Sequence, residues 1–268
     1  MGGPLVAIKI GPVSVYWYGI IIVTGVLLGA YIASSEARRR GEDTEHVWDA
    51  LIMVVIMAIV GARLYHVFSS PAEGLGWTYY RENPIEVVFL WNGGLAIFGA
   101  FVGGALGVLL YAYWRKLNTL RWLDIGAPGL LAGQVVGRWG NFLNQELYGP
   151  PTTLPWGIPI DQYHRISPYN NLSAYPLSTR FHPVFLYESL WNLVGLVVML
   201  LASRRLAGRL KEGDLLAAYM IWYPLGRLWV EMLRPDAWMI GQVPTAQIVS
   251  LVLMVVGVVM LVRNHWLR

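Results

Sequence analysis

The sequence contains no cysteine and few charged side chains. Without cysteine the fold has no disulfide bonds, and any thiol chemistry has to use a thiol that a substrate supplies. Charged residues make up only 13% of the 268 residues, whereas hydrophobic residues make up 56%. This balance excludes an ordinary water-soluble domain and predicts that lipid is the main solvent. The formal net charge of +4 does not indicate a nucleic-acid partner, because the basic residues stand in short clusters between apolar runs.

Apolar runs long enough to cross a membrane recur along the chain, and a helical span takes about 20 residues. We expect seven spans, at residues 14–33, 47–68, 94–114, 124–142, 184–203, 215–233 and 244–262. The predicted fold class is therefore an all-α integral membrane protein that forms a single polytopic domain over residues 1–268. Glycines spaced four residues apart in the third and fourth spans predict close helix contacts.

Alternate connections between these runs differ strongly in positive charge. One set contains most of the basic residues and is predicted to be cytoplasmic: Arg38, Arg39, Arg40, Arg115, Lys116, Arg121, Arg204, Arg205, Arg209, Lys211, Arg263 and Arg268. The other set contains only Lys9, Arg81, Arg165, Arg180 and Arg234. We therefore predict an outward N-terminus and a cytoplasmic C-terminus. The long connection at residues 143–183 then forms an outer loop, whose tyrosines and tryptophan favour a cap at the membrane surface.

Three arginines lie within predicted spans, where a charge is costly: Arg63, Arg138 and Arg227. With the predicted topology, all three lie toward the outer ends of their helices. Polar residues gather around them at a similar depth: Tyr18, Asn141, Asn144, Glu146, His182, Glu188 and Glu231. Because a guanidinium donates two hydrogen bonds to an oxyanion and stays charged, the group predicts a phosphate site such as a phospholipid headgroup would fill. The alternative is structural ion pairs, with Arg227 bound to Glu231 and Arg138 to Glu146 or Glu188.

The most specific motif is Gly137-Arg138-Trp139-Gly140-Asn141-Phe142-Leu143-Asn144-Gln145-Glu146, closed by Gly149. It closely resembles the G-R-x-G-N-F-x-N-x-E-x-x-G signature of bacterial prolipoprotein diacylglyceryl transferases at all eight fixed positions. The resemblance extends over nearly the whole chain, through Trp17-Tyr18-Gly19, Gly61 to Arg63, Gly93-Gly94, Asp124 to Pro128, His182-Pro183, Tyr187-Glu188, Gly226-Arg227, Glu231 and Arg234-Pro235-Asp236.

This resemblance implies a transfer reaction in the bacterial cytoplasmic membrane, with the active site towards the outer leaflet. The diacylglyceryl group of phosphatidylglycerol would move to the lipobox cysteine thiol of a prolipoprotein signal peptide, and glycerol phosphate would leave. No metal or other cofactor is expected. The implied catalytic residues are Arg138, Arg227, Glu231, Tyr18 and Glu146. The implied phosphatidylglycerol-binding residues are Arg138, Arg227, Asn141, Asn144, Gly149, Arg63 and His182.

One position departs from the family pattern. Members often have His or Tyr after the double glycine of the third span, whereas this chain has Phe98, which cannot transfer a proton. The substrate thiol is then activated by another group, with Glu231, Glu146, His182 and Tyr18 as candidates, or the arginines lower its pKa without a dedicated base. His182 precedes Pro183, so a capping or packing role is the competing interpretation.

Two other classes of function use the same residues. A transporter or channel for an organic anion would bind its solute with the arginines, but it needs polar groups near the midplane, and the halves of the chain show no repeat. A scaffold that only binds signal peptides would consume no lipid.

Asp124, at the cytoplasmic start of the fourth span, is expected to cap a helix. The spacing of His46, His66, His164 and His265 matches no metal-ligand motif.

Overall fold

The computed structural model is mostly helical and describes residues 5–11, 13–69, 76–90, 93–235, 239–240 and 243–266. The helices are α1 (Trp17–Arg39), α2 (Glu45–Ser69), α3 (Trp77–Glu82), α4 (Ile97–Trp114), α5 (Thr119–Leu143), α6 (Val184–Arg205), α7 (Asp214–Glu231) and α8 (Thr245–Trp266). Short antiparallel ribbons join β1 (Val6–Ile10) to β2 (Val13–Tyr16), β3 (Ile158–Pro159) to β4 (Arg180–Phe181), and β5 (Met239–Ile240) to β6 (Val243–Pro244). The described residues also form the 3-10 helices η1 (Pro84–Val88) and η3 (Gln162–His164).

Each predicted span coincides with one helix, namely α1, α2 and α4 to α8. The largest boundary error is in the first span, because residues 14–16 belong to strand β2 and the helix continues to Arg39. The apolar run crosses the turn from strand to helix without a change in composition. Basic residues in the last turn, Arg38 and Arg39, made the end of the helix resemble a loop. Asp236 and Arg268 lie outside the described residues.

Within the described residues, four helices are long and apolar enough to cross a membrane: α1, α2, α6 and α8. Helix α4 contains a shorter apolar stretch, Phe98–Trp114. Helices α5 and α7 are not among these four, and they are the two that contain Arg138 and Arg227. Because charged groups are costly in lipid, such helices belong inside a bundle rather than at its lipid-facing surface. The chain is a mostly helical, multi-pass membrane protein.

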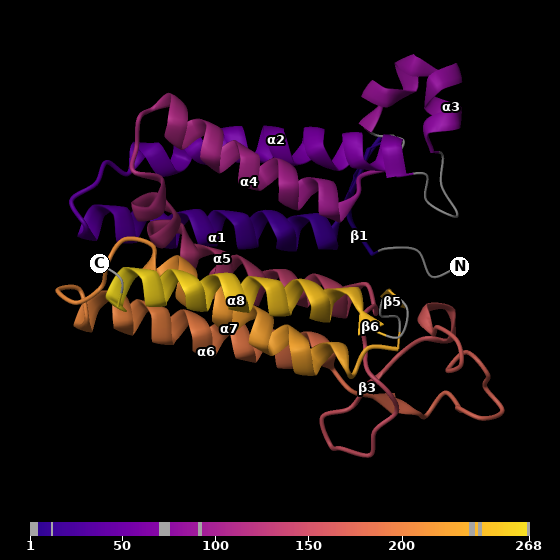
Figure 1. Cartoon of the computed structure of the whole chain (residues 1–268). Helices are drawn as coiled ribbons and strands as arrows, with labels where there is room; N and C mark the ends of the chain where they lie inside the picture. The colour runs from indigo at the N-terminus through magenta and orange to yellow at the C-terminus, as the bar shows by residue number, and fades with distance from the viewer. Residues whose placement is uncertain are drawn as a thin grey trace. The chain divides into compact units, whose positions relative to one another are not determined.

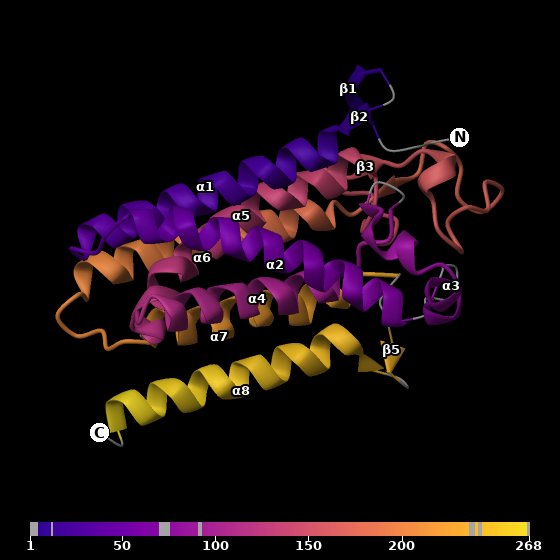
Figure 2. The same ribbon diagram turned by 90° about the horizontal axis from the view of Figure 1, so that it is seen from above.

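The chain divides into two compact units, residues 34–122 and residues 1–33 together with 123–268. In the first of these, α2 and α4 lie side by side in both views (Figures 1 and 2). A Cβ atom on Gly61 would collide with the carbonyl oxygen of Gly99, and one on Gly107 would lie 2.9 Å from the Cα atom of Val54. The predicted glycine row of the third span therefore forms a close contact between helix backbones.

The other unit contains most of α1 and α5, together with α6, α7 and α8. A Cβ atom on Gly29 would lie 2.6 Å from the carbonyl oxygen of Gly129, so α1 and α5 also meet through small residues. The buried side chains of Leu131, Leu196 and Leu215 join α5, α6 and α7. In Figures 1 and 2, ribbons β1–β2, β3–β4 and β5–β6 lie at one end of this unit, and the last turn of α8 lies at the other.

At the end of this unit that lies away from the ribbons, α5 caps the start of α7. The buried carboxylate of Asp124 accepts hydrogen bonds from the backbone N–H groups of Gly213 and Leu216, each at 2.8 Å. These N–H groups belong to the first turn of α7, where an unpaired donor needs an acceptor. Asp124 caps a helix as predicted, but this helix is α7 and not α5, to which Asp124 itself belongs. Asp214 is in turn bound by Asn264 at 2.9 Å, which ties α8 to the same place.

The connection between α5 and α6 is ordered around a buried arginine. Arg165 donates to the backbone oxygens of Ile160 at 2.8 Å and Tyr175 at 2.7 Å, and its guanidinium lies 5.1 Å from the ring centroid of Phe181. Tyr148, Ile160 and Phe181 are buried together beside it. This segment, which includes most of the predicted cap at residues 143–183, has a small core of its own.

Candidate functional site

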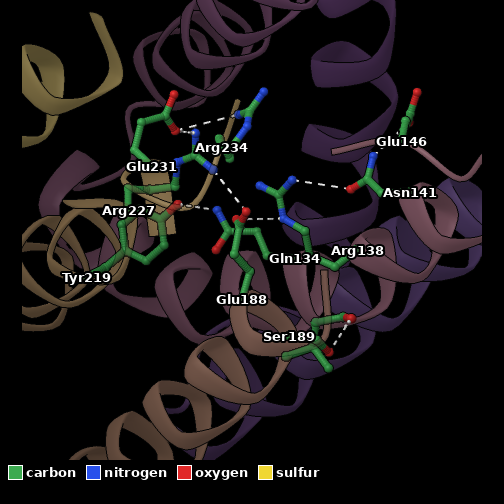
Figure 3. Close-up of polar contacts among 11 residues, drawn as sticks. Gln134, Arg138, Asn141, Glu146, Glu188, Ser189, Tyr219, Arg227, Glu231 and Arg234 are labelled. Carbon is green, nitrogen blue, oxygen red and sulfur yellow. Dashed lines mark hydrogen bonds and ion pairs between the residues drawn. The ribbon is translucent and has the colours of Figure 1, made fainter. Parts of the chain in front are cut away.

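A single buried carboxylate joins two arginines from different helices. Glu188 of α6 has one oxygen 2.9 Å from Nη1 of Arg227 and the other 2.9 Å from Nε of Arg138 (Figure 3). The Glu188 side chain is 4% exposed, and those of Arg138 and Arg227 are 20% and 12% exposed. Two guanidiniums, one each from α5 and α7, therefore converge on one anionic group. Both are the predicted phosphate-binding arginines.

The two arginines are held differently by Glu188. Arg227 donates a hydrogen bond to it, whereas the contact with Arg138 is an ion pair, because Oε2 of Glu188 accepts no hydrogen bond from the described residues. Within the described chain, Arg138 donates one hydrogen bond, to Oδ1 of Asn141 at 3.3 Å. A guanidinium has five N–H donors. Most of the donors of Arg138 thus remain free to bind a further acceptor.

Each arginine has a second polar neighbour on its own side of the bridge. Arg227 forms an ion pair and a hydrogen bond with Glu231, one turn later on α7. Arg234 also approaches Glu231, with 3.6 Å between Nη1 and Oε2. On the other side, the amide of Asn141 donates to Glu146 at 2.8 Å. Asn141 therefore connects Arg138 to the exposed carboxylate of Glu146 (Figure 3).

Tyr18 and Gly149 fit tightly into the same unit. The ring of Tyr18 lies over Gly140, where a Cβ atom would come within 2.8 Å of Cδ2 of the ring. The N–H of Gly149 donates to the carbonyl oxygen of His182 at 2.9 Å, and a Cβ atom on this glycine would lie 2.9 Å from Cβ of His182. Both glycines of the motif therefore allow close approach by another segment. Asn144 lies where α5 ends, with its N–H bound to the carbonyl oxygen of Gly140 at 3.0 Å.

His182 belongs to a polar chain at the start of α6. Its Nδ1 lies 2.9 Å from the hydroxyl of Tyr187, which also accepts a hydrogen bond from Nε1 of Trp156 at 3.0 Å. Trp156 comes from the long connection between α5 and α6, so this chain fixes that connection to the first turn of α6. The geometry gives His182 the packing role that the sequence offered as its alternative interpretation. It leaves open the prediction that His182 also binds the lipid.

Arg63 lies in the other compact unit and has a different environment. It is 5% exposed, and it donates to the backbone oxygens of Glu86, Val87, Phe89, Gly93 and Gly94. Its guanidinium also lies 5.1 Å from the ring centroid of Tyr80. All five N–H donors of Arg63 thus find carbonyl acceptors in the segment between α2 and α4. A phosphate could bind here only by displacing one of them.

Glu188 is the residue that the predicted set of site residues omitted. It was one possible partner of Arg138, and the motif Tyr187-Glu188 belonged to the family resemblance, yet no sequence pattern places Glu188 between both arginines. Arg234 was likewise read only as part of a loop motif. Within the described chain, no three His, Asp or Glu side chains are arranged to hold a metal ion.

The fold and the site define a class: a multi-pass helical membrane protein with two partly buried arginines around one buried carboxylate. Comparison with known proteins identifies the family. The family model described as prolipoprotein diacylglyceryl transferase matches residues 5–263.

Three relatives, each named phosphatidylglycerol–prolipoprotein diacylglyceryl transferase, are similar over nearly their full length. The protein of Chloroflexus aggregans is 44% identical over 269 residues, which cover 95% of this chain and 86% of the relative. That of Synechococcus elongatus is 42% identical over 97% of this chain and 87% of the relative. That of Halalkalibacterium halodurans is 41% identical over 96% of this chain and 84% of the relative. The chain belongs to the prolipoprotein diacylglyceryl transferase family.

Proposed function

We propose that this protein transfers the diacylglyceryl group of phosphatidylglycerol to the cysteine thiol of a prolipoprotein signal peptide. The sulfur attacks the glyceryl carbon that bears the phosphate ester, and a thioether bond forms. The carbon–oxygen bond breaks, and glycerol phosphate leaves with the electron pair of that bond. The thiol proton passes to a base or to water, so the reaction needs no oxidant, reductant or cofactor.

The observation that carries this proposal is the bridge from Arg138 through Glu188 to Arg227. A phosphodiester, like a carboxylate, offers two non-bridging oxygens to a pair of guanidiniums, and Arg138 has donors left for it. Negative charge on the phosphate grows as the carbon–oxygen bond breaks. Two fixed cations at the edge of a low-dielectric bundle stabilise that charge more in the transition state than in the bound lipid.

The neighbouring residues take supporting roles in this proposal. Glu231 orients Arg227, and the pair Asn141 and Glu146 orients Arg138. Tyr18, packed on Gly140, forms a wall of the lipid site. Asn144, Gly149 and His182 shape the outer rim where α5 ends and α6 begins. For Arg63 we propose a structural role, because five backbone oxygens already use its donors.

Activation of the thiol does not involve Phe98, because a phenyl ring cannot accept a proton. The residue is 49% exposed, and its ring centroid lies 6.1 Å from that of Tyr65. Among the four candidate bases, Glu231 is already bound by Arg227 and approached by Arg234, so its oxygens are engaged by two guanidiniums. Glu146 is exposed and is bound by a neutral amide, so its carboxylate is the best placed to accept a proton. A thiol with an ordinary pKa of about 8.5 needs only modest help from it.

The membrane arrangement completes the proposal. We place the seven helices α1, α2 and α4 to α8 across the bacterial cytoplasmic membrane, with the connection between α5 and α6 on the outer side. The support is the distribution of basic residues and the position of ribbon β3–β4 at the opposite end of its unit from the last turn of α8 (Figure 1). The transporter of an organic or lipid anion, the alternative from the sequence, has no support from the relatives.

The test is to incubate the purified protein with phosphatidylglycerol and a synthetic lipobox peptide, and to analyse the peptide by mass spectrometry. We expect a mass increase equal to one diacylglyceryl group, and none when the peptide cysteine is replaced by serine. An unmodified cysteine peptide, with folded protein and lipid present, would overturn the proposal. Accumulation of lipid anion in vesicles containing only this protein would then support transport.

A further inference from the structure

Helix α5 ends in a turn whose backbone conformation usually requires glycine. Gln145, two residues after the helix, has a φ of 51°. Its N–H donates to the carbonyl oxygen of Phe142 at 3.1 Å, and the N–H of Glu146 donates to that of Asn141 at 3.0 Å. These two hydrogen bonds define a Schellman motif, in which Gln145 occupies the left-handed position. A side chain with a Cβ atom is disfavoured there, so the presence of glutamine requires a reason.

Helix α4, in the other compact unit, ends in the same motif and provides a comparison. Lys116 is in the left-handed position with a φ of 54°, and the N–H of Leu117 donates to the carbonyl oxygen of Ala112 at 2.8 Å. The last two residues are apolar, as is usual where this motif serves only to end a helix. The equivalent positions at the end of α5 are Asn141 and Glu146, whose side chains share a hydrogen bond of 2.8 Å. The α5 turn therefore carries a polar pair of the candidate site.

The side chain of Gln145 is clamped to the long connection between α5 and α6. Its Nε2 donates to Oδ2 of Asp161 at 2.8 Å, and its Oε1 accepts a hydrogen bond from the backbone N–H of Asp161 at 2.7 Å. Asp161 directly follows Ile160, which is buried in the small core of the connection and whose carbonyl oxygen is bound by Arg165 at 2.8 Å. A fixed point of the connection thus braces the left-handed turn.

We propose that Gln145 and Asp161 are positioning residues for the transfer reaction, because their clamp holds the turn that directs the carboxylate of Glu146 toward Asn141. This inference rests on the proposed function, in which Glu146 accepts the thiol proton and Asn141 connects it to Arg138. The side chain of Glu146 is exposed, so packing does little to fix it, and the backbone of the turn decides where its carboxylate lies. Gln145 and Asp161 act through Glu146 and contact no reacting atom.

The first experiment measures kcat and KM in the transfer assay for variants of the clamp. Gln145→Ala loses both hydrogen bonds and keeps the disfavoured φ, so its kcat should fall roughly tenfold. Its KM for phosphatidylglycerol should stay within about twofold, because both phosphate-binding arginines are unaltered. Gln145→Gly loses the same hydrogen bonds but adopts the turn without strain, so most of the lost kcat should return. Asp161→Asn retains an oxygen acceptor for the amide and should be more active than Asp161→Ala.

Lys116→Ala is the matched control, since it truncates an exposed side chain at the same position of the same motif. It should leave kcat unchanged. If Gln145→Ala also leaves kcat unchanged, or if Gln145→Gly is no more active than Gln145→Ala, the positioning proposal is wrong.

A second experiment tests whether the clamp acts through Glu146. In a Glu146→Gln background, adding Gln145→Ala should lower kcat by less than about twofold, because the group that it positions is already disabled. The same tenfold loss in both backgrounds would show that the clamp has only a structural role. Hydrogen exchange gives a readout that does not depend on activity: the N–H of Glu146 should exchange faster in Gln145→Ala, and an unchanged rate would contradict the proposal. These failures leave the proposed function intact, whereas absence of transfer by the unaltered protein would overturn the function itself.

Discussion

The two compact units both contain arginines within their helices, and they neutralise these arginines in different ways. In the unit of residues 34–122, Arg63 is surrounded by five backbone carbonyl oxygens. In the other unit, Arg138 and Arg227 face the carboxylate of Glu188, and Arg138 donates only one hydrogen bond within the described chain. All five donors of Arg63 are used by acceptors in the protein, whereas Arg138 still has unused donors.

We propose that this difference separates a structural arginine from a ligand-binding one. An ionisable residue within a membrane helix is by default a candidate for function. In this proposal Arg63 is an exception to that rule, because the irregular segment between α2 and α4 supplies carbonyl acceptors for all five of its donors. What distinguishes the two cases is the number of unused donors, which the sequence does not reveal.

The largest expected effect comes from truncating either arginine of the bridge. Arg138→Ala or Arg227→Ala should lower the transfer rate about 100- to 1,000-fold, because one donor to the developing phosphate charge is lost. The rate of peptide modification, followed by mass spectrometry, measures this effect. Arg204→Ala, which removes an exposed arginine at the far end of α6, serves as the control. Its transfer rate should be close to that of the unaltered protein. Near-normal turnover in both bridge variants would contradict the phosphate role.

Next in size is the effect of Glu188→Gln. Removing the shared negative charge leaves two buried cations without their common partner, which should lower the free energy of unfolding by about 3 kcal/mol. Added phosphatidylglycerol should restore part of the loss, since its phosphate supplies the missing charge. Thermal unfolding in detergent, with and without the lipid, measures both changes. Equal stabilisation of the variant and the unaltered protein by the lipid would argue against a phosphate position between the arginines.

Arg63→Gln should act on local structure more than on the chemistry. The loss of these hydrogen bonds should weaken the binding of the five carbonyl groups around Arg63 and destabilise their segment by about 2 kcal/mol. Hydrogen exchange of the N–H groups in residues 76–90 should speed up, while the KM for phosphatidylglycerol stays within about twofold of the unaltered value. Arg81→Gln, an exposed arginine on α3, is the control. A large rise in KM without faster exchange would make Arg63 a lipid-binding residue after all.

The smallest effect is expected for Phe98→Leu. The ring cannot take up a proton, and it lies half-exposed on α4, so a leucine of similar volume should change the transfer rate by less than about threefold. Phe101→Leu, on the same helix and more exposed, is the matched comparison. A complete loss of activity in Phe98→Leu, with folding preserved, would show that the ring shapes the lipid site.

The helices could be predicted from the sequence because apolar runs of about 20 residues leave few alternatives. All seven were found, but several ends were misplaced: α1 begins after strand β2, which is as apolar as the helix, and the start of α5 and the end of α8 lie outside the predicted bounds. The irregular segment that binds Arg63 could not be predicted. Its carbonyl groups lie 23 to 31 residues from Arg63 along the chain, and no local pattern specifies such contacts.

The members of the site were largely predictable, but their pairing was not. Arg138, Asn141 and Glu146 follow from one motif, and the structure joins them in one hydrogen-bonded chain. The position of Glu188 depends on how α5, α6 and α7 face one another, which is a tertiary property.

The contact between Asp124 and the start of α7 also sets a register between the two arginine helices. Fourteen residues separate Asp124 from Arg138, and fourteen separate Gly213 from Arg227. At a rise of 1.5 Å per residue, the backbone positions of both arginines lie about 21 Å along their helices from the contact between Asp124 and Gly213. Deleting one residue from either stretch would draw one arginine back by about 1.5 Å and turn it by about 100°. Between these two points the family should therefore tolerate substitutions far better than changes in length, and matched deletions in both helices should be less harmful than a deletion in one.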